Sequence, residues 1–342
     1  MQSKVLLIYT GGTIGMACNP KTCALEPVDF ERLLSCVPEL QQLTTQVDTY
    51  QFEPPIDSSD MSPQHWSRLA HLVADRYADY DGFVILHGTD TMAYTASALS
   101  FMLQNLTKPV ILTGSQLPIG QLRTDGKENL ITSIEMASAR HQDGTAFVPE
   151  VGIYFNGHLL RGNRTTKQSA DDFNAFESFN YPHLADAGVN ITYHEDLIHK
   201  PDLRRSMTPS FELDTGVVIF SLFPGVRQEL ISHILSSPSV RSIVMRTFGS
   251  GNAPQAPWLI STIREATRRG KVVVNISQCL QGSVEMGRYD TGLQLREAGV
   301  VSGHDSTVEA AVTKLMFLQA RYDSPEKVRR LMDQSIAGEI TV

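Results

Sequence analysis

The stretch LLIYTGGTIGM, residues 6–16, decides the fold of the first half of the chain. Four apolar or aromatic residues run directly into Thr-Gly-Gly-Thr, which is typical of a buried strand that ends in a tight turn. Consecutive glycines allow backbone N–H groups to approach a small ligand, so we expect Thr13 to line a pocket. The alternative is a plain glycine-rich turn, and neither a Walker motif nor GxGxxG is present.

Outward from this turn, apolar strands alternate with helical stretches. Apolar residues recur at helical spacing in residues 62–80 and 91–106, whereas DGFVILHGTD (81–90) and KPVILTGS (108–115) are apolar strands that end in glycine and a hydroxyl residue. This alternation predicts an α/β fold with a mainly parallel sheet covered on both faces. The carboxyl ends of such strands converge on one crevice, where we expect the functional site.

The alternation is interrupted once, at residues 191–214, where periodicity weakens and charged residues gather. We interpret this segment as a linker between a larger N-terminal domain, residues 1–190, and a smaller C-terminal α/β domain, residues 215–342. A chain of 342 residues is long enough for roughly two domains.

The composition is that of a globular protein, with 42% hydrophobic and 19% charged residues. The net charge of −8 argues against a nucleic-acid partner, and no apolar run approaches the ~20 residues of a membrane span. The cysteines form no CxxC pair and the histidines no HExxH motif or Cys/His cluster, so we expect reduced thiols, no metal, no cofactor and a cytoplasmic location. The cysteines are Cys18, Cys23, Cys36 and Cys279.

A second motif, HGTDTMAYTASAL (87–99), places Thr89 and Asp90 between a strand and a helix. Asp90 is either a helix cap or, with Thr89, a hydroxyl–carboxylate pair that binds and activates a substrate. Lys167, in the polar segment GNRTTKQSADDF, is either a solvated surface lysine or a desolvated base that faces Asp90.

The segment IDSSDM, residues 56–61, also has two interpretations. Either Ser58 or Asp60 caps the following helix, or the polar groups of Asp57, Ser58 and Ser59 grip a substrate.

Taken in order, TGGTIG, HGTDTMAYTASAL and RGNRTTK resemble the bacterial type I (cytoplasmic) L-asparaginase family, and the likeness continues through GNAP and VVVNISQC. The resemblance covers nearly the whole chain. It implies a larger N-terminal and a smaller C-terminal α/β domain. It also implies a homodimer or homotetramer whose active site lies between one N-terminal domain and a neighbouring subunit's C-terminal domain.

The resemblance also implies a role for individual residues. Thr13 matches the primary nucleophile, and Thr89, Asp90 and Lys167 match a second catalytic triad. Asp90 also matches the residue that binds the substrate's α-amino group, Ser58 the residue that binds its α-carboxylate, and the backbone near Ser115 the groups around its side-chain amide. Asn252 matches a residue that is contributed across the subunit interface. The implied reaction is attack by Thr13 on the side-chain amide of L-asparagine, loss of ammonia, and hydrolysis of a β-aspartyl ester to L-aspartate.

One departure from the family concerns the lid expected at residues 17–28. Many members carry a tyrosine there, whereas this chain has NPKTCALEPV, with Ala24 or Leu25 near that position. Tyr289, in MGRYDTG, is a candidate replacement; the alternative is a half-buried core tyrosine.

The resemblance further implies an effector site for asparagine, formed by Thr166, Arg246 and Cys279. Arg246 suits this role best because a guanidinium binds a carboxylate bidentately, whereas Cys279 could equally be a small core residue.

Two other functions compete with this one. The first is the glutamine-hydrolysing subunit of a tRNA-dependent amidotransferase, a relative that usually carries an extra N-terminal domain. The second is a non-catalytic amino-acid-binding regulator, against which the presence of Thr13, Thr89, Asp90 and Lys167 argues.

Overall fold

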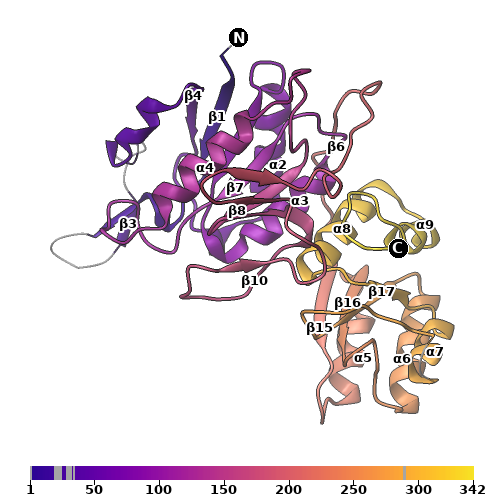
Figure 1. Ribbon diagram of the computed structural model, residues 1–342. Helices are drawn as coiled ribbons and strands as arrows, with labels where there is room; N and C mark the ends of the chain where they lie inside the picture. The colour runs from indigo at the N-terminus through magenta and orange to yellow at the C-terminus, as the bar shows by residue number, and fades with distance from the viewer. Residues whose placement is uncertain (1, 19–24, 28–32, 34, 288–289) are drawn as a thin grey trace. The chain divides into compact units, whose positions relative to one another are not determined.

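The computed structural model describes residues 2–18, 25–27, 33, 35–287 and 290–342, and it divides into two compact units, Met1–Phe211 and Glu212–Val342 (Figure 1). Each unit is an α/β structure with its own sheet and its own hydrophobic core. This confirms the predicted fold class.

The first unit is built on an eight-stranded sheet of order β13-β12-β9-β8-β7-β5-β1-β4. The five adjacent strands β4, β1, β5, β7 and β8 are parallel. Beyond β8, the strands β9, β12 and β13 each pair antiparallel with the preceding strand of the sheet. The strands are β1 (Lys4–Tyr9), β4 (Gln46–Gln51), β5 (Gly82–Leu86), β7 (Val110–Thr113), β8 (Val151–Phe155), β9 (His158–Arg161), β12 (Ala185–Ala187) and β13 (Ile191–Tyr193).

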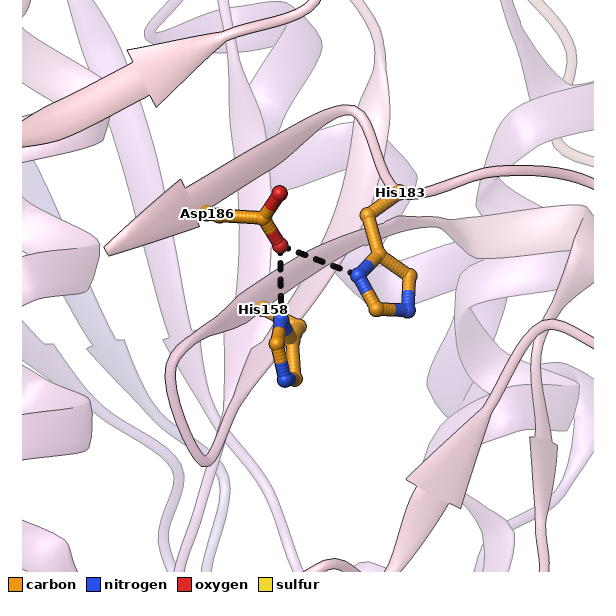
Figure 2. A group of neighbouring side chains, drawn as sticks. All are labelled: His158, His183 and Asp186. Atoms are coloured by element: carbon orange, nitrogen blue, oxygen red, sulfur yellow. Dashed lines mark hydrogen bonds and ion pairs between the residues drawn. The ribbon is translucent and has the colours of Figure 1, made fainter. Parts of the chain in front are cut away.

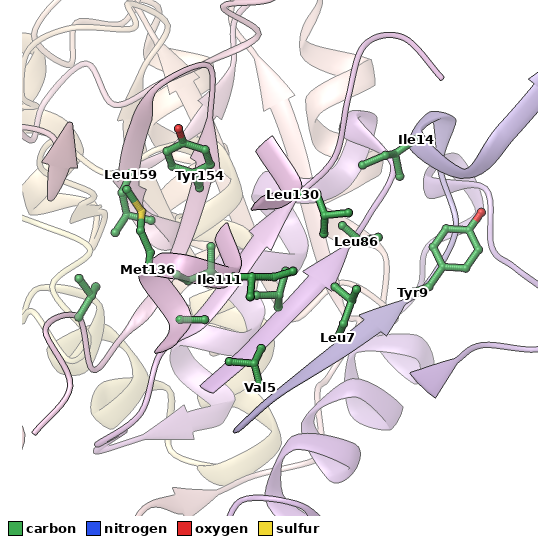
Figure 3. Close-up of a cluster of buried hydrophobic side chains, with 14 of the residues drawn as sticks. Val5, Leu7, Tyr9, Ile14, Leu86, Ile111, Leu130, Met136, Tyr154 and Leu159 are labelled. Carbon is green, nitrogen blue, oxygen red and sulfur yellow. The ribbon is translucent and has the colours of Figure 1, made fainter. Parts of the chain in front are cut away.

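Among the described residues, two helices pack on this sheet and a third packs on one of them. Helix α4 (Gly126–Ser138) packs on β1, β5 and β7, whereas α3 (Met92–Met102) packs on β7, β8 and α2 (Pro63–Asp75). Val5, Leu7 and Tyr9 of β1 lie in the same core cluster as Leu130 of α4, on the face of the sheet that α4 covers (Figure 3). Because the intervening residues of β1 are also buried, the strand reads as a continuous apolar run, as parallel strands do.

Short strands complete the first unit. They are β2 (Met16–Cys18) paired with β3 (Leu25–Pro27), β10 (Thr166–Lys167) paired with β11 (Phe176–Glu177), and β6 (Leu103–Gln104) paired with β14 (Thr208–Pro209). Single 3₁₀ turns are η1 (Thr13–Gly15), η2 (Pro38–Gln42), η3 (Ser58–Asp60), η4 (Thr89–Thr91) and η5 (Gly162–Arg164).

The interpretation of residues 191–214 as a linker is wrong for most of the segment. β13 is an edge strand of the main sheet and β14 pairs with β6, so both belong to the first unit, which ends at Phe211. These strands have three and two residues, which is too short for an alternating pattern to be recognised among the charged residues around them.

The second unit has a four-stranded parallel sheet of order β15-β16-β17-β18. Its strands are β15 (Val217–Ser221), β16 (Ser242–Thr247), β17 (Val272–Ser277) and β18 (Val301–Ser302), and its helices are α5 (Gln228–Ser236), α6 (Pro257–Arg268), α7 (Asp290–Glu297), α8 (Val308–Arg321) and α9 (Pro325–Met332). Apolar residues of α5, α6 and α7 pack with those of β15, β16 and β17 in one core, while α8 packs on β15 and β16 and α9 on β17 and β18.

None of the helices in the described part of the chain combines the length and the hydrophobicity that a membrane span requires. In the described part of the chain, neither Cys36 nor Cys279 is in a disulfide. The side chains of Cys18 and Cys23 lie outside the described residues.

Candidate active site

The carboxyl ends of β1, β5 and β7 meet at one edge of the first sheet. Tyr9 pairs with Leu86, and Leu86 pairs with Thr113. Backbone hydrogen bonds continue one residue further, from the N–H of Thr10 to Leu86 and from the N–H of His87 to Thr113. The three turns that follow these strands, which carry the predicted site residues Thr13, Thr89 and Ser115, therefore start side by side.

Glycines bring these turns into close backbone contact. Gly12 has a φ of 97°, and a Cβ built on it would lie 2.5 Å from the Cα and N of Gly88. A Cβ on Gly88 would in turn lie 2.5 Å from the Ser58 Oγ. The double glycine therefore allows two turns of the protein to approach each other. Thr13 and Thr89 directly follow the two glycines that are in contact, and the Ser58 side chain contacts Gly88.

Thr89, Asp90 and Lys167 form a hydrogen-bonded trio. The Lys167 amine donates to the Thr89 hydroxyl at 2.8 Å and to the Asp90 Oδ1 at 2.7 Å. The Lys167 side chain is only 18% exposed, whereas that of Asp90 is 64% exposed. Of the two interpretations of Lys167, the structure contradicts the solvated surface lysine and places the amine between a hydroxyl and a carboxylate.

The trio continues into Gln116, a residue that sequence reasoning missed. The Thr89 hydroxyl donates to the Gln116 side-chain oxygen at 3.4 Å, and the Gln116 amide donates to the Asp172 carbonyl at 2.9 Å. The only signal for it was its position directly after the TGS of a strand end. Gln116 links the turn after β7 to the segment that follows Lys167.

Asp125 holds the turn after β7 in place, and sequence reasoning missed it as well. Its carboxylate accepts from the backbone N–H groups of Gln116 and Leu117, and from the Asn129 amide at 3.3 Å. Ser115 is buried, and its hydroxyl donates to the Leu117 carbonyl at 2.5 Å. The hydroxyl of Ser115 is therefore engaged within its own turn.

Residues 57–59 pack against the start of α3. The Thr91 hydroxyl donates to the Ser58 carbonyl at 2.6 Å, and Ser58 is buried. Asp57 accepts from the backbone N–H and the hydroxyl of Ser59, and these hydrogen bonds hold the pKa of Asp57 below its usual value. The expectation that Ser58 or Asp60 caps the next helix is wrong, because Ser62 is the N-cap of α2.

A buried network lies behind Gly88. Trp66 donates to the Thr95 hydroxyl at 2.9 Å, the Thr95 hydroxyl lies 2.9 Å from His87 Nε2, and His87 Nδ1 lies 2.7 Å from the Gly88 carbonyl. An indole can only donate and a carbonyl can only accept, so the network assigns the proton to His87 Nδ1. Burial lowers the pKa of His87 to about 4, which keeps the ring neutral.

Thr13 begins η1 and is partly exposed. Among the described residues it is not part of the Thr89–Asp90–Lys167 trio. Tyr289 and most of the expected lid lie outside the described residues, although β2 and β3 pair at the two ends of that segment. The proposed replacement of the lid tyrosine by Tyr289 stays a prediction.

The predicted effector residues lie in both units. Arg246 on β16 and Cys279 after β17 are at the carboxyl edge of the second sheet, where the Gln278 amide donates to the Arg246 carbonyl. Cys279 is exposed, so it is not a core residue. Thr166 is on β10 of the first unit, next to Lys167. Asn252 pairs with Phe248 after β16 and accepts a hydrogen bond from Thr291.

Comparison with known proteins gives matches along the whole chain. The family model described as the N-terminal asparaginase domain matches residues 4–199, and the model described as the C-terminal glutaminase/asparaginase domain matches residues 216–332. L-asparaginase 1 of Escherichia coli K12 is 42% identical, over 100% of this chain and 99% of that protein. A mouse 60 kDa lysophospholipase is 38% identical over 100% of this chain but 63% of its own length. The crystal structure of L-asparaginase I from Vibrio cholerae matches with a TM-score of 0.90 and 40% identity, covering 100% of both chains.

Proposed function

The chain belongs to the asparaginase family, in agreement with its resemblance to the type I L-asparaginases, and we propose that it hydrolyses L-asparagine to L-aspartate and ammonia through an ester on Thr13. The observation that carries this proposal is the Lys167 amine hydrogen-bonded to both Thr89 and Asp90. Two hydroxyl groups follow glycines that are in contact, and one of them already has an acid–base partner.

In the first step, the Thr13 oxygen attacks the side-chain amide carbon. The C–N bond breaks, the amide nitrogen takes up the proton that Thr13 loses and leaves as ammonia, and a β-aspartyl ester remains on Thr13. A threonine hydroxyl is a weak nucleophile until a base accepts its proton. The sequence offers Tyr289 as the candidate for this activating role.

In the second step, water hydrolyses the ester. The attacking water gives a proton to the relay formed by the Thr89 hydroxyl and the Lys167 amine, the ester C–O bond breaks, and the Thr13 oxygen takes a proton back. The Asp90 carboxylate accepts a hydrogen bond from the Lys167 amine and holds it in this relay. Gln116 orients the Thr89 hydroxyl from the other side. This assigns Thr13 to ester formation and the trio to ester hydrolysis.

The substrate is a zwitterion, and the site has a group for each charge. Asp90 is largely exposed and carries a negative charge that can hold the α-amino group. The backbone at residues 57–59, fixed by Thr91 and by the Asp57 side chain, is suited to the α-carboxylate. Ser115 contributes through its backbone, because its hydroxyl is already bonded to Leu117.

We also propose that asparagine acts as an effector at Arg246. The Arg246 Nε is buried and has no hydrogen-bond partner among the described residues, and a buried donor without a partner is costly unless a ligand satisfies it. A guanidinium binds a carboxylate with two parallel hydrogen bonds. The resemblance adds Cys279 and Thr166 to this effector site, which it places at the interface between subunits. A homodimer or homotetramer in the cytoplasm is part of the same proposal.

The experiment is ammonia release by the purified chain over a range of L-asparagine concentrations, with L-glutamine in parallel. We expect release from asparagine that is lost in Thr13→Val, and a sigmoidal dependence that becomes hyperbolic in Arg246→Gln. Absence of ammonia from either amide would contradict the proposed activity. A strictly hyperbolic curve in the unmodified chain would contradict the effector site alone.

A further inference from the structure

Three histidines converge on one carboxylate at the antiparallel edge of the first sheet. His158 begins β9, Asp186 lies opposite it in the register of β12, His183 precedes that strand by two residues, and His194 directly follows β13. The side chains are 27% to 42% exposed, so solvent reaches the cluster. None of them takes part in the proposed reaction.

Two of the imidazole rings, those of His158 and His183, lie within hydrogen-bond distance of the same Asp186 oxygen. His158 Nδ1 lies 2.7 Å and His183 Nδ1 lies 3.0 Å from the Asp186 Oδ1, as Figure 2 shows. The three ligand-type atoms of His158, His183 and Asp186 all lie within 4.8 Å of one another. We propose that these three residues form a binding site for a divalent transition-metal ion of the Zn²⁺ class.

The chemistry of the donor set fits this ion. Imidazole nitrogens with one carboxylate oxygen suit Zn²⁺ and its first-row neighbours, whereas Mg²⁺ and Ca²⁺ prefer oxygen ligands. In tetrahedral coordination at ligand distances of about 2.0–2.2 Å, neighbouring ligand atoms are about 3.3 Å apart. The His158 and His183 nitrogens therefore need to move away from the Asp186 oxygen by about 0.5 Å as a metal replaces the shared protons.

Two further residues form the hydrogen bonds that usually orient metal ligands. The second nitrogen of His183, Nε2, lies 3.3 Å from the Glu177 Oε1, so Glu177 can accept its proton while Nδ1 binds the metal. His194 Nε2 lies 2.8 Å from the other oxygen of Asp186. A carboxylate behind a ligating histidine is a regular feature of zinc sites. With neutral imidazoles, Asp186 and Glu177 together balance the charge of a divalent ion.

The fourth position is open to water, because the cluster faces solvent and, within the described residues, three side chains supply the ligand atoms. The positions of these residues along the chain match no known metal-binding motif. They are His158, His183, Asp186 and His194. Only the antiparallel pairing of β9 with β12, and of β12 with β13, brings them together.

The test is an isothermal calorimetric titration of the full chain with Zn²⁺, after any bound metal has been removed with a chelator. We expect one Zn²⁺ per chain, with affinity at least tenfold weaker in His158→Gln and in Asp186→Asn. Glu177→Ala should weaken binding by about 10–100-fold. His233→Gln, which changes an exposed histidine of α5, is the control and should bind as the unmodified chain does. No Zn²⁺ binding, or equal affinity in all four variants, would overturn the proposal.

A second measurement needs no variant. In the chain labelled with ¹⁵N-histidine, Zn²⁺ should shift the Nδ1 resonances of two histidines while their Nε2 atoms remain protonated. Shifts confined to Nε2 atoms, or spread over the exposed histidines, would show surface binding only and would also overturn the proposal.

Discussion

Gly12 and Gly88 are in backbone contact, although they lie in turns that follow two different strands of the sheet, β1 and β5. A Cβ on Gly12 would lie 2.5 Å from both the Cα and the N of Gly88, at a φ of 97° that side chains rarely adopt. Each glycine directly precedes a threonine of the proposed site. The contact therefore fixes the separation of Thr13 and Thr89 through the backbone, independently of either side chain.

Gly12→Ala should lower kcat strongly and reduce the free energy of unfolding by about 3 kcal/mol, because strain at positive φ adds to a clash with backbone. Urea unfolding and ammonia release measure the two effects. The matched control is Gly144→Ala, which has a φ of 86° but nothing within 4 Å, and which should cost only about 1 kcal/mol. Equal losses of stability in both variants would show that the contact with Gly88 does not matter.

Lys167→Met should lower kcat by a factor of about 10²–10⁴, the usual contribution of a positioned acid–base group. The methionine keeps much of the side-chain volume, so the free energy of unfolding should change little. Lys127→Met is the control, because Lys127 is a partly exposed lysine that lies 3.7 Å from Glu39. If the two variants have similar kcat values, Lys167 is not part of the chemistry.

The pKa of His87, lowered to about 4 by burial, predicts a pH dependence of stability. Between pH 6.5 and about 4 the unfolded chain binds a proton at this ring that the folded chain does not. The free energy of unfolding should therefore fall as the pH decreases through this window, by at most about 3 kcal/mol from this group.

The measurement for His87 is urea unfolding at pH 7.5, 6 and 5. His87→Asn keeps a donor toward the Gly88 carbonyl but does not titrate, so its stability should fall less over the same range. A slope unchanged from that of the unmodified chain would assign the pH dependence to other groups.

The ion pair between Lys314 and Glu339 is buried in the second unit, so removing one of its partners should be costly. The two groups lie 2.5 Å apart and are buried, and Glu339 also accepts from the backbone of Ile336 and Ala337. Glu339→Gln should cost about 3–5 kcal/mol, because it leaves a buried lysine without its counter-ion.

Thermal unfolding checks this prediction. The double variant Lys314→Met with Glu339→Gln should lose less stability than Glu339→Gln alone, since no buried charge remains uncompensated. Additive losses in the double variant would contradict the coupling of the two charges.

The central part of the fold could be predicted because its signals are local and strong. Buried strands such as residues 4–9 and 82–86 read as apolar runs, and the helical spacing within residues 62–80 predicted α2. Elements of two or three residues, such as β13 and β14, were missed. They are specified by pairing with strands elsewhere in the chain, and a period cannot be read from so few residues.

Some residues of the candidate site could be predicted from the sequence, and others could not. A motif at a strand end identified Thr89 and Asp90, and the polar segment GNRTTKQSADDF offered Lys167. The structure brings these three together. Gln116 and His87 were missed, because their contacts join segments that are distant in sequence or buried behind the site. The histidines around Asp186 were missed for the same reason, since only sheet register makes them neighbours.

The central claim is that Thr13 carries the acyl group and that Thr89 serves its hydrolysis. The most direct test is to mix Thr89→Val with L-asparagine, quench with acid, and locate any aspartyl adduct by intact-mass spectrometry and peptide mapping. We predict that the ester accumulates on Thr13, because the variant forms it but hydrolyses it slowly. An adduct on another residue, or ammonia release at the unmodified rate, would contradict this account.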